Sequence, residues 1–149
     1  MPARFQLVID CKDPERLARF WAAALGYVLE PPPEGFATWD DYRRHIGLSG
    51  SYLGMDADSI IDPSGRGPRI WFHAMPDVKV VKNRLHLDIH ASGFPSRADP
   101  LAVRRQRVDA EARRLVDLGA TLTVVMSTEG LDHYAVGMQD PEGNEFDIN

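Results

Sequence analysis

Four residues of metal-ligand type lie where a shared site could form in this chain of 149 residues: Gln6, His73, His86 and Asp147. Two imidazoles, an amide oxygen and a carboxylate suit Zn, Ni, Co, Fe or Mn, and they leave coordination positions open for water or substrate. An ion held in this way polarises a substrate carbonyl or lowers the pKa of bound water. The residue types therefore predict metal-assisted chemistry on a small molecule, provided that the fold brings them to one site.

A repeat in the sequence suggests how these residues could meet. The segment 5–10 returns as 85–90, and the Asp-Pro-Ser-Gly turn at 62–65 returns as Asp-Pro-Glu-Gly at 140–143. Each half is predicted to form a strand, a helix and three further strands. The first module covers about 1–77, the second about 83–149, and a short connection joins them. Polar residues on equivalent strands of two such modules can converge on one shared site.

The two helices have recognisable start and stop signals. Asp13, followed by proline, is a good N-cap and first-turn pair, and Gly26 supplies a left-handed stop. Trp21 falls in the apolar stripe of this helix and is expected in the core. Asp99, again followed by proline, is predicted to cap the second helix. Strands are expected at about 4–10, 27–30, 69–75, 85–90, 121–125, 134–139 and 144–148, short strand pieces at 36–39 and 44–48, and loops at 50–54 and 91–100.

Alternation along the strands assigns side chains to faces. The residues expected to pack under the helices include Phe5, Leu7, Ile9, Leu85, Leu87, Ile89, Phe146 and Ile148. The residues expected on the opposite face include Gln6, Asp10, Trp71, His73, His86, Asp88, His90, Glu145 and Asp147. A solvated sheet face usually favours Lys, Glu and Thr, whereas this face collects His, Gln, Asp and Trp. The residue types therefore favour a site on this face over a plain solvated surface.

Composition narrows the classes of partner. A net charge of −5, with 44% hydrophobic and 26% charged residues, is typical of a globular protein. No nucleic-acid partner is expected, because phosphate binding needs a positive excess, and the basic run 104–107 is predicted to be a solvated helix face. No membrane partner is expected either, since no apolar run approaches about 20 residues. Cys11 is the only cysteine and the first residues lack signal-peptide features, which together favour the cytoplasm.

Several segments together resemble a known superfamily. They are the strand with Gln6, the Asp-Pro-Glu-Arg-Leu helix that ends in Leu-Gly at 25–26, the Asn-Arg-Leu-His-Leu-Asp strand at 83–88, and Asp-Pro-Glu-Gly-Asn-Glu-Phe at 140–146. This combination resembles the vicinal oxygen chelate superfamily and, within it, the small glyoxalase-like proteins of the glyoxalase/bleomycin resistance/dioxygenase type. The resemblance implies an α+β fold and a single domain over 1–149, in which two βαβββ modules form curled mixed sheets around a central pocket. It also implies a homodimer.

The resemblance assigns one metal ligand to the first strand and one to the last strand of each module. Gln6 and His86 then come from the first strands, and His73 and Asp147 come from the last strands. A shift of two residues in the strand at 69–75 would put Trp71, which cannot ligate a metal, in the place of His73. Asp147 replaces the glutamate that is usual at its position and is one methylene shorter.

These residues predict a glyoxalase-like small-molecule enzyme with lyase, isomerase or dioxygenase chemistry on an oxygen-bearing substrate. Glu145 is the candidate general base. Trp39, Trp71 and Asp88 are the candidate substrate contacts, with Met55 as a further apolar wall. The alternative is a protein of the same fold that binds or sequesters a small molecule without a metal.

Overall fold

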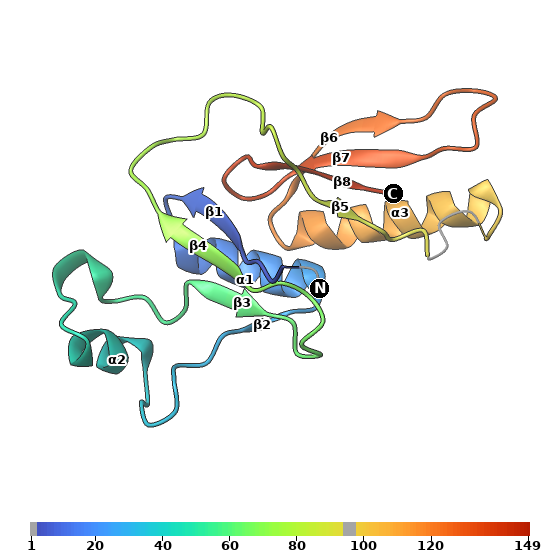
Figure 1. Cartoon of the computed structure of the whole chain (residues 1–149). Helices are drawn as coiled ribbons and strands as arrows, with labels where there is room; N and C mark the ends of the chain where they lie inside the picture. The colour runs from blue at the N-terminus through green and yellow to red at the C-terminus, as the bar shows by residue number, and fades with distance from the viewer. Residues whose placement is uncertain (1–2, 94–97) are drawn as a thin grey trace. The chain divides into compact units, whose positions relative to one another are not determined.

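The computed structural model describes residues 3–93 and 98–149 (Figure 1). Residues 1–2 and residues 94–97, which belong to the predicted loop at 91–100, lie outside the described residues. The described chain forms two compact units, Met1–Val78 and Lys79–Asn149.

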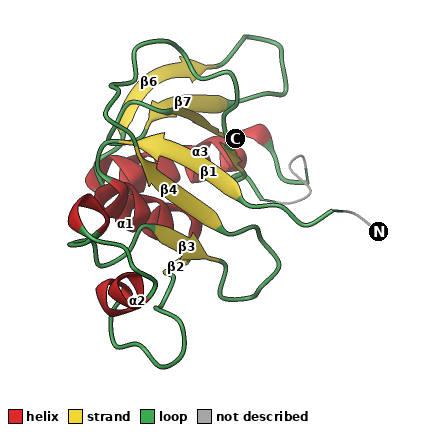
Figure 2. Ribbon diagram, turned by 60° about the vertical axis from the view of Figure 1, so that its left-hand side comes forward, coloured by secondary structure: helices red, strands yellow, loops and turns green. Residues whose placement is uncertain are grey.

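The first unit is a mixed four-stranded sheet with the long helix α1 on one face (Figures 1 and 2). The strand order is β1-β4-β3-β2, with β1 parallel to β4 and the other pairs antiparallel. Its elements are β1 Leu7–Cys11, α1 Pro14–Leu25, β2 Val28–Leu29, α2 Trp39–His45, a 3-10 turn Gly50–Tyr52, β3 Ser59–Ile61 and β4 Ile70–Ala74.

The second unit has the same order of elements, without the helical insertion. Its sheet order is β5-β8-β7-β6, in which β5 is parallel to β8 and the other pairs are antiparallel. Helix α3 covers one face of this sheet (Figure 2). The elements are β5 Asp88–Ile89, α3 Leu101–Asp117, β6 Thr121–Met126, β7 Ala135–Gln139 and β8 Glu145–Ile148. The α+β fold of two βαβββ modules is thus confirmed.

The predicted signals of α1 and of the two turns are present in the structure. The Asp13 Oδ1 atom accepts a hydrogen bond from the Arg16 amide at 3.0 Å, and Gly26 is left-handed with φ of 70°. Trp21 is buried, with 2% of its surface exposed. Each Asp-Pro-x-Gly turn closes through its glycine amide, which donates to the carbonyl of the aspartate three residues earlier at 2.9 Å in both copies. Local propensity and tertiary packing agree here, as they do in most natural sequences.

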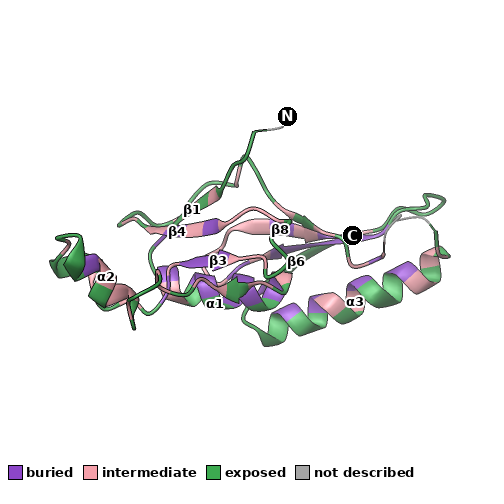
Figure 3. Cartoon of the chain, turned by 60° about the horizontal axis from the view of Figure 1, so that its bottom comes forward, coloured by how far each residue is buried: buried purple, intermediate pink, exposed green. Residues whose placement is uncertain are grey.

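Each unit has its own apolar core between helix and sheet (Figure 3). The fully buried side chains of the first unit include Leu17, Ile60 and Phe72. Those of the second unit include Val108, Leu115, Val136, Met138, Phe146 and Ile148. The opposite sheet faces are left for the polar residues.

The predicted burial of Phe5 and Leu85 is wrong. Phe5 is 74% exposed and Leu85 is 86% exposed. The reason is that β1 begins only at Leu7 and β5 only at Asp88, so both residues precede the paired strand. Alternation assigns a face only where the backbone is held in a ladder.

Strands were the wrong prediction for 36–39 and 44–48, where the structure has helix α2 and its flanks. Thr38 caps this helix by accepting a hydrogen bond from the Asp41 amide at 3.1 Å. Acidic residues occupy its first turn and basic residues its last turn, which suits the helix dipole. The sequence therefore contained a helix signal here, although the helix is short.

The start of α3 also differs from the prediction. Pro100, and not Asp99, is the N-cap residue, and none of the described side chains caps the helix. The Asp99 carboxylate instead accepts a hydrogen bond from Arg107 at 2.6 Å. Arg104 in the basic run is buried and pairs with Asp132, so this helix face is not simply solvated. Within residues 3–93 and 98–149, none of the helices combines the length and the apolarity that crossing a bilayer requires.

Candidate metal centre

Three side chains of the second unit bring metal-ligating atoms together. The His86 Nε2 atom lies 3.5 Å from Asp88 Oδ1 and 3.5 Å from Asp147 Oδ2. The three ligand atoms all lie within 4.8 Å of one another. This spacing is close to that of ligands around one ion with bonds of about 2.0–2.2 Å, so only small side-chain adjustments are needed.

The pairing of two neighbouring strands explains this cluster. Strands β5 and β8 are parallel, and their register puts Asp88 opposite Asp147. The Asp147 amide donates to the Leu87 carbonyl at 2.9 Å and so fixes the register just before β5. His86 lies two residues before Asp88 and thus shares its face, because side chains alternate along extended backbone.

The other face of β8 belongs to the core. Phe146 is 1% exposed and Ile148 is fully buried, both on the side of the sheet that α3 covers. Asp147, between them in sequence, therefore points away from α3. This arrangement keeps the cluster on the polar face of the sheet.

The cluster is open to solvent and rich in negative charge. The side chains of His86, Asp88 and Asp147 are 39%, 44% and 31% exposed. Two carboxylates on one side of an imidazole repel each other, and a divalent cation would relieve this repulsion. Asn149 supports the group by donating from Nδ2 to Asp88 Oδ2 at 3.2 Å. One nitrogen and two carboxylate donors fit Mn, Fe, Co, Ni or Zn.

In the first unit, Gln6 has a different partner. Its Oε1 atom accepts a hydrogen bond from Arg69 Nη1 at 3.0 Å. The same guanidinium donates to Glu30 at 2.8 Å and to the buried Ser59 hydroxyl at 2.9 Å. Burial alone would raise the pKa of Glu30, but the hydrogen bonds from Arg69 and Ser59 outweigh it and lower that pKa. The amide oxygen of Gln6 is thus held in an existing network.

His73 is paired with Asp10 and not with Gln6. The His73 Nδ1 and Asp10 Oδ1 atoms lie 3.1 Å apart, and the two residues are register partners on β4 and β1. Gln6 lies four residues earlier than Asp10, which is about 13 Å along an extended chain. The structure therefore does not bring Gln6 and His73 together within the first unit.

The register also bears on the choice between His73 and Trp71. Asp147 lies opposite the residue two positions after His86. The corresponding residue two positions after Gln6 is Val8, and its partner is Trp71. By this internal comparison Trp71, and not His73, occupies the place of Asp147. The ligand set of Gln6, His73, His86 and Asp147 includes residues of both units and stays a prediction.

The two tryptophans expected to contact substrate have separate surroundings. Trp71 packs against the His73 ring at 4.7 Å and donates from Nε1 to Asp58 at 3.2 Å. Trp39 donates from Nε1 to the Glu30 carbonyl at 2.8 Å. Trp39 also lines, together with Met55, a cavity of about 510 Å³ at the start of α2. Trp71 is not among the described residues that line this cavity, and the substrate roles of both tryptophans and of Asp88 stay predictions.

Glu145 is engaged in a local ion pair. Its carboxylate oxygens lie 3.0 Å and 2.8 Å from Lys79 Nζ, and it also accepts a hydrogen bond from the Asn83 amide at 2.9 Å. The hydrogen bond from Lys79, helped by that amide, lowers the pKa of Glu145 to about 2. A carboxylate with so low a pKa is a weak base at neutral pH. Its role as general base stays a prediction that this geometry disfavours.

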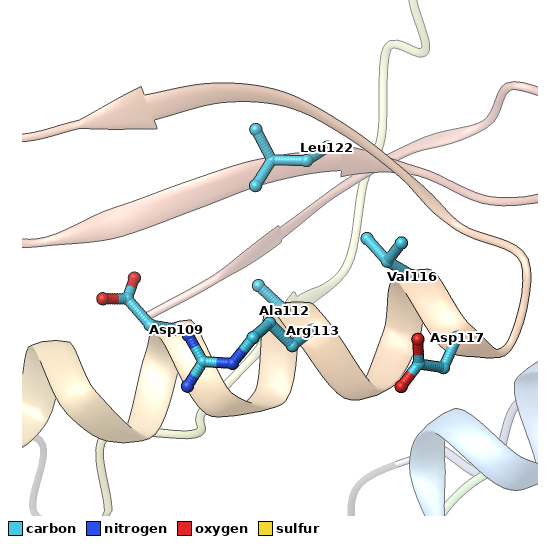
Figure 4. A pocket seen from close by; sticks show the side chains of 6 residues that line it. All are labelled: Asp109, Ala112, Arg113, Val116, Asp117 and Leu122. Atoms are coloured by element: carbon cyan, nitrogen blue, oxygen red, sulfur yellow. The ribbon is translucent and has the colours of Figure 1, made fainter.

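A hollow of the second unit lies on the face of the sheet opposite the His86 cluster. It has a volume of about 310 Å³ and is lined by α3 residues and Leu122 of β6 (Figure 4). Its walls combine the apolar Ala112, Val116 and Leu122 with charged residues at the rim. It is a gap between helix and sheet edge and is separate from the His86 cluster, since Leu122 faces α3.

The sequence predicted His86 and Asp147 as metal ligands and Asp88 as a substrate contact; the structure brings the three side chains together, and their roles stay predictions. The signal for Asp88 was present, because a His-x-Asp spacing on a strand puts both side chains on one face. The partnership of Asp10 with His73 depends on strand register, which the sequence does not state.

The fold is that of the vicinal oxygen chelate superfamily. Residues 6–149 match the family model described as glyoxalase-like domain, and the chain belongs to this family. No curated protein matches the chain.

Solved structures share the fold at low sequence identity. A glyoxalase/bleomycin resistance protein/dioxygenase family enzyme from Burkholderia phytofirmans PsJN is 18% identical, with a TM-score of 0.56 over 97% of this chain and 94% of that chain. A superfamily member from Sphaerobacter thermophilus is 14% identical, with a TM-score of 0.54 over 99% and 96%. The fosfomycin resistance protein FosX from Listeria monocytogenes is 9% identical, with a TM-score of 0.59 over 99% and 92%.

Proposed function

We propose that this protein is a glyoxalase-like small-molecule enzyme that holds a divalent metal ion at His86 and Asp147, with Asp88 beside them. The single observation behind this proposal is that three ligand atoms lie within 4.8 Å of one another on the polar face of one sheet. A bound divalent ion supplies Lewis-acid polarisation of an oxygen-bearing substrate, the chemistry that lyase and isomerase reactions of this kind need.

A structural neighbour supports this choice of ligand. One structure of a mutant FosX from Listeria monocytogenes is a complex with Mn(II) and 1S,2S-dihydroxypropylphosphonic acid. That protein shares the fold with this chain at 9% identity, with a TM-score of 0.60. We infer that the ligand here is likewise a compact molecule with several oxygen atoms.

The residues of the cluster have distinct proposed roles. The His86 imidazole supplies the nitrogen donor, and the Asp147 carboxylate supplies charge from the strand beside it. Asp88, which is held by the Asn149 amide, can bind the ion directly or accept a hydrogen bond from a ligand hydroxyl.

The second candidate function is binding of a small molecule without a metal. The first unit favours this function, because its side chains are poor metal ligands. Arg69 donates a hydrogen bond to the Gln6 amide oxygen, and Trp71 is at the position equivalent to Asp147. In that case His86, Asp88 and Asp147 would recognise polar groups of the ligand by hydrogen bonds alone.

We also propose that the protein is a homodimer in the cytoplasm. The support for a dimer is that Leu122, Val124 and Val125 on the edge strand β6 are about half exposed, and an apolar edge strand favours pairing. The support for a reducing compartment is that Cys11 is the only cysteine of the sequence and is buried, so no intrachain disulfide can form.

Titration of chelator-treated protein with Mn(II) and Zn(II) tests the first function. We expect one equivalent to bind, and acetohydroxamate, a small bidentate oxygen ligand, to bind only after the metal. Acetohydroxamate binding that is equally strong without metal would favour the second function. Absence of metal binding by the native chain would contradict the first.

A further inference from the structure

The edge strand β6 contains an irregularity next to the His86 cluster. Its pairing with β7 runs from Leu122 opposite Met138 directly to Val124 opposite Gly137, so Thr123 is the extra residue of a β-bulge. Leu122 pairs with a core residue and faces α3, as the hollow in Figure 4 also shows. Bulges place two consecutive side chains on nearly the same side of a strand and often re-aim one of them toward a functional site.

The surroundings of Gly137 show the direction of the Thr123 and Val124 side chains. A methyl group at position 137 would lie 2.8 Å from Val124 Cγ1, 3.1 Å from Thr123 Oγ1 and 3.5 Å from Asp147 Oδ1. Gly137 is the register partner of Asp147 on the neighbouring strand. The side chains of Thr123 and Val124 thus both lie above Gly137, on the same face of the sheet as the Asp147 side chain.

The Thr123 hydroxyl is available for a ligand. Thr123 is exposed, and its hydroxyl has no hydrogen-bond partner among residues 3–93 and 98–149. A regular strand would place consecutive side chains on opposite faces, so without the bulge Thr123 and Val124 could not both approach Gly137. A glycine at 137 is also needed, because the Val124 methyl group fills the place of any Cβ there.

We propose that Thr123 is a ligand-binding residue of the His86 site. Its hydroxyl donates a hydrogen bond to an oxygen of an anionic ligand held beside Asp147, and the Val124 methyl groups contact a small aliphatic part of the same ligand. This inference rests on the proposed function and deepens it by naming the ligand class: a compact anionic oxygen compound with a short aliphatic group. Acetohydroxamate has both features and is a suitable probe.

The test compares Thr123→Val with native protein, Thr123→Ser and the matched control Thr121→Val on the same strand. The dissociation constant of Mn(II) is measured first by calorimetry, and that of acetohydroxamate is then measured on the Mn(II)-loaded proteins. We expect Mn(II) affinity to stay within about twofold in all variants. Acetohydroxamate should bind about fivefold more weakly to Thr123→Val, since one hydrogen bond to a ligand is lost. Thr123→Ser should restore the affinity, and Thr121→Val should leave it unchanged.

Two outcomes separate the inference from the function on which it rests. Equal acetohydroxamate affinity in Thr123→Val and native protein, with Mn(II) bound to both, overturns the role of Thr123 and leaves the metal site standing. Failure of native protein to bind Mn(II) overturns the proposed function itself, and the role of Thr123 falls with it.

Discussion

Replacement of His86 by alanine is expected to weaken Mn(II) and Zn(II) binding by at least about 100-fold. The imidazole is the only nitrogen donor in the cluster of His86, Asp88 and Asp147. Its loss leaves two carboxylates, and oxygen donors alone hold Zn(II) poorly against water. The side chain is 39% exposed, so the substitution opens no core cavity and the variant should remain folded. Calorimetric titration of both proteins at one pH gives the two dissociation constants.

His133→Ala is the matched control for this prediction. His133 is also an exposed histidine of the second unit, in the loop between β6 and β7, and it is outside the cluster. Its replacement should leave metal affinity unchanged. If His86→Ala binds Mn(II) as tightly as the native chain, the ligands lie elsewhere.

Replacement of Phe146 by alanine should cost about 3–5 kcal/mol of unfolding free energy. Phe146 is 1% exposed on β8 and packs on the face of the sheet toward α3. The substitution deletes a buried ring and leaves a cavity that the closely packed neighbours cannot fill. For a chain of this size we expect the unfolding temperature to fall by roughly 10 °C. Denaturant titration with a common slope for both proteins measures the change.

Phe5→Ala provides the comparison, because the residue type is the same and 74% of Phe5 is exposed. It should change the free energy by no more than about 0.5 kcal/mol. If Phe146→Ala destabilises the protein no more than Phe5→Ala does, the assignment of Asp147 to the polar face loses its basis. Phe146→Leu, which retains much of the apolar volume, should give an intermediate loss and serves if the alanine variant does not fold.

The parts of the fold that the sequence predicted correctly are those decided by local chemistry. Asp13 and Gly26 bound α1 because an N-cap oxygen and a left-handed glycine act within a few residues of themselves. Phe146 and Asp147 are on opposite faces because alternation holds wherever strands are paired. These are the signals from which the polar face and the pair of His86 and Asp147 were inferred.

The parts that could not be predicted depend on pairing between distant segments. Phe5 and Leu85 were expected in the core because alternation was extended to them. The prediction failed because the point at which a ladder begins is set by the partner strand. Thr38 and the charges of α2 are a helix signal, but this helix has only 7 residues, and so short a helix is not stable from local signals alone. Arg104 was expected in solvent because it belongs to a basic run. Its burial could not be predicted, since its partner Asp132 lies 28 residues away.

The site shows the same division. Alternation placed His86 on one face with Asp88, but only the register of β5 and β8 makes Asp88 the neighbour of Asp147. The bulge at Thr123 has no signal in the sequence, because it exists only in the pairing of β6 with β7. Residues whose roles depend on register therefore need the structure.

Anomalous X-ray diffraction from crystals loaded with Zn(II) tests the central claim most directly. The account predicts one strong peak on the polar face of the second unit, about 2.0–2.2 Å from His86 Nε2 and from an Asp147 carboxylate oxygen. A peak from an ion that other residues bind, or no peak in crystals soaked in excess Zn(II), would contradict it.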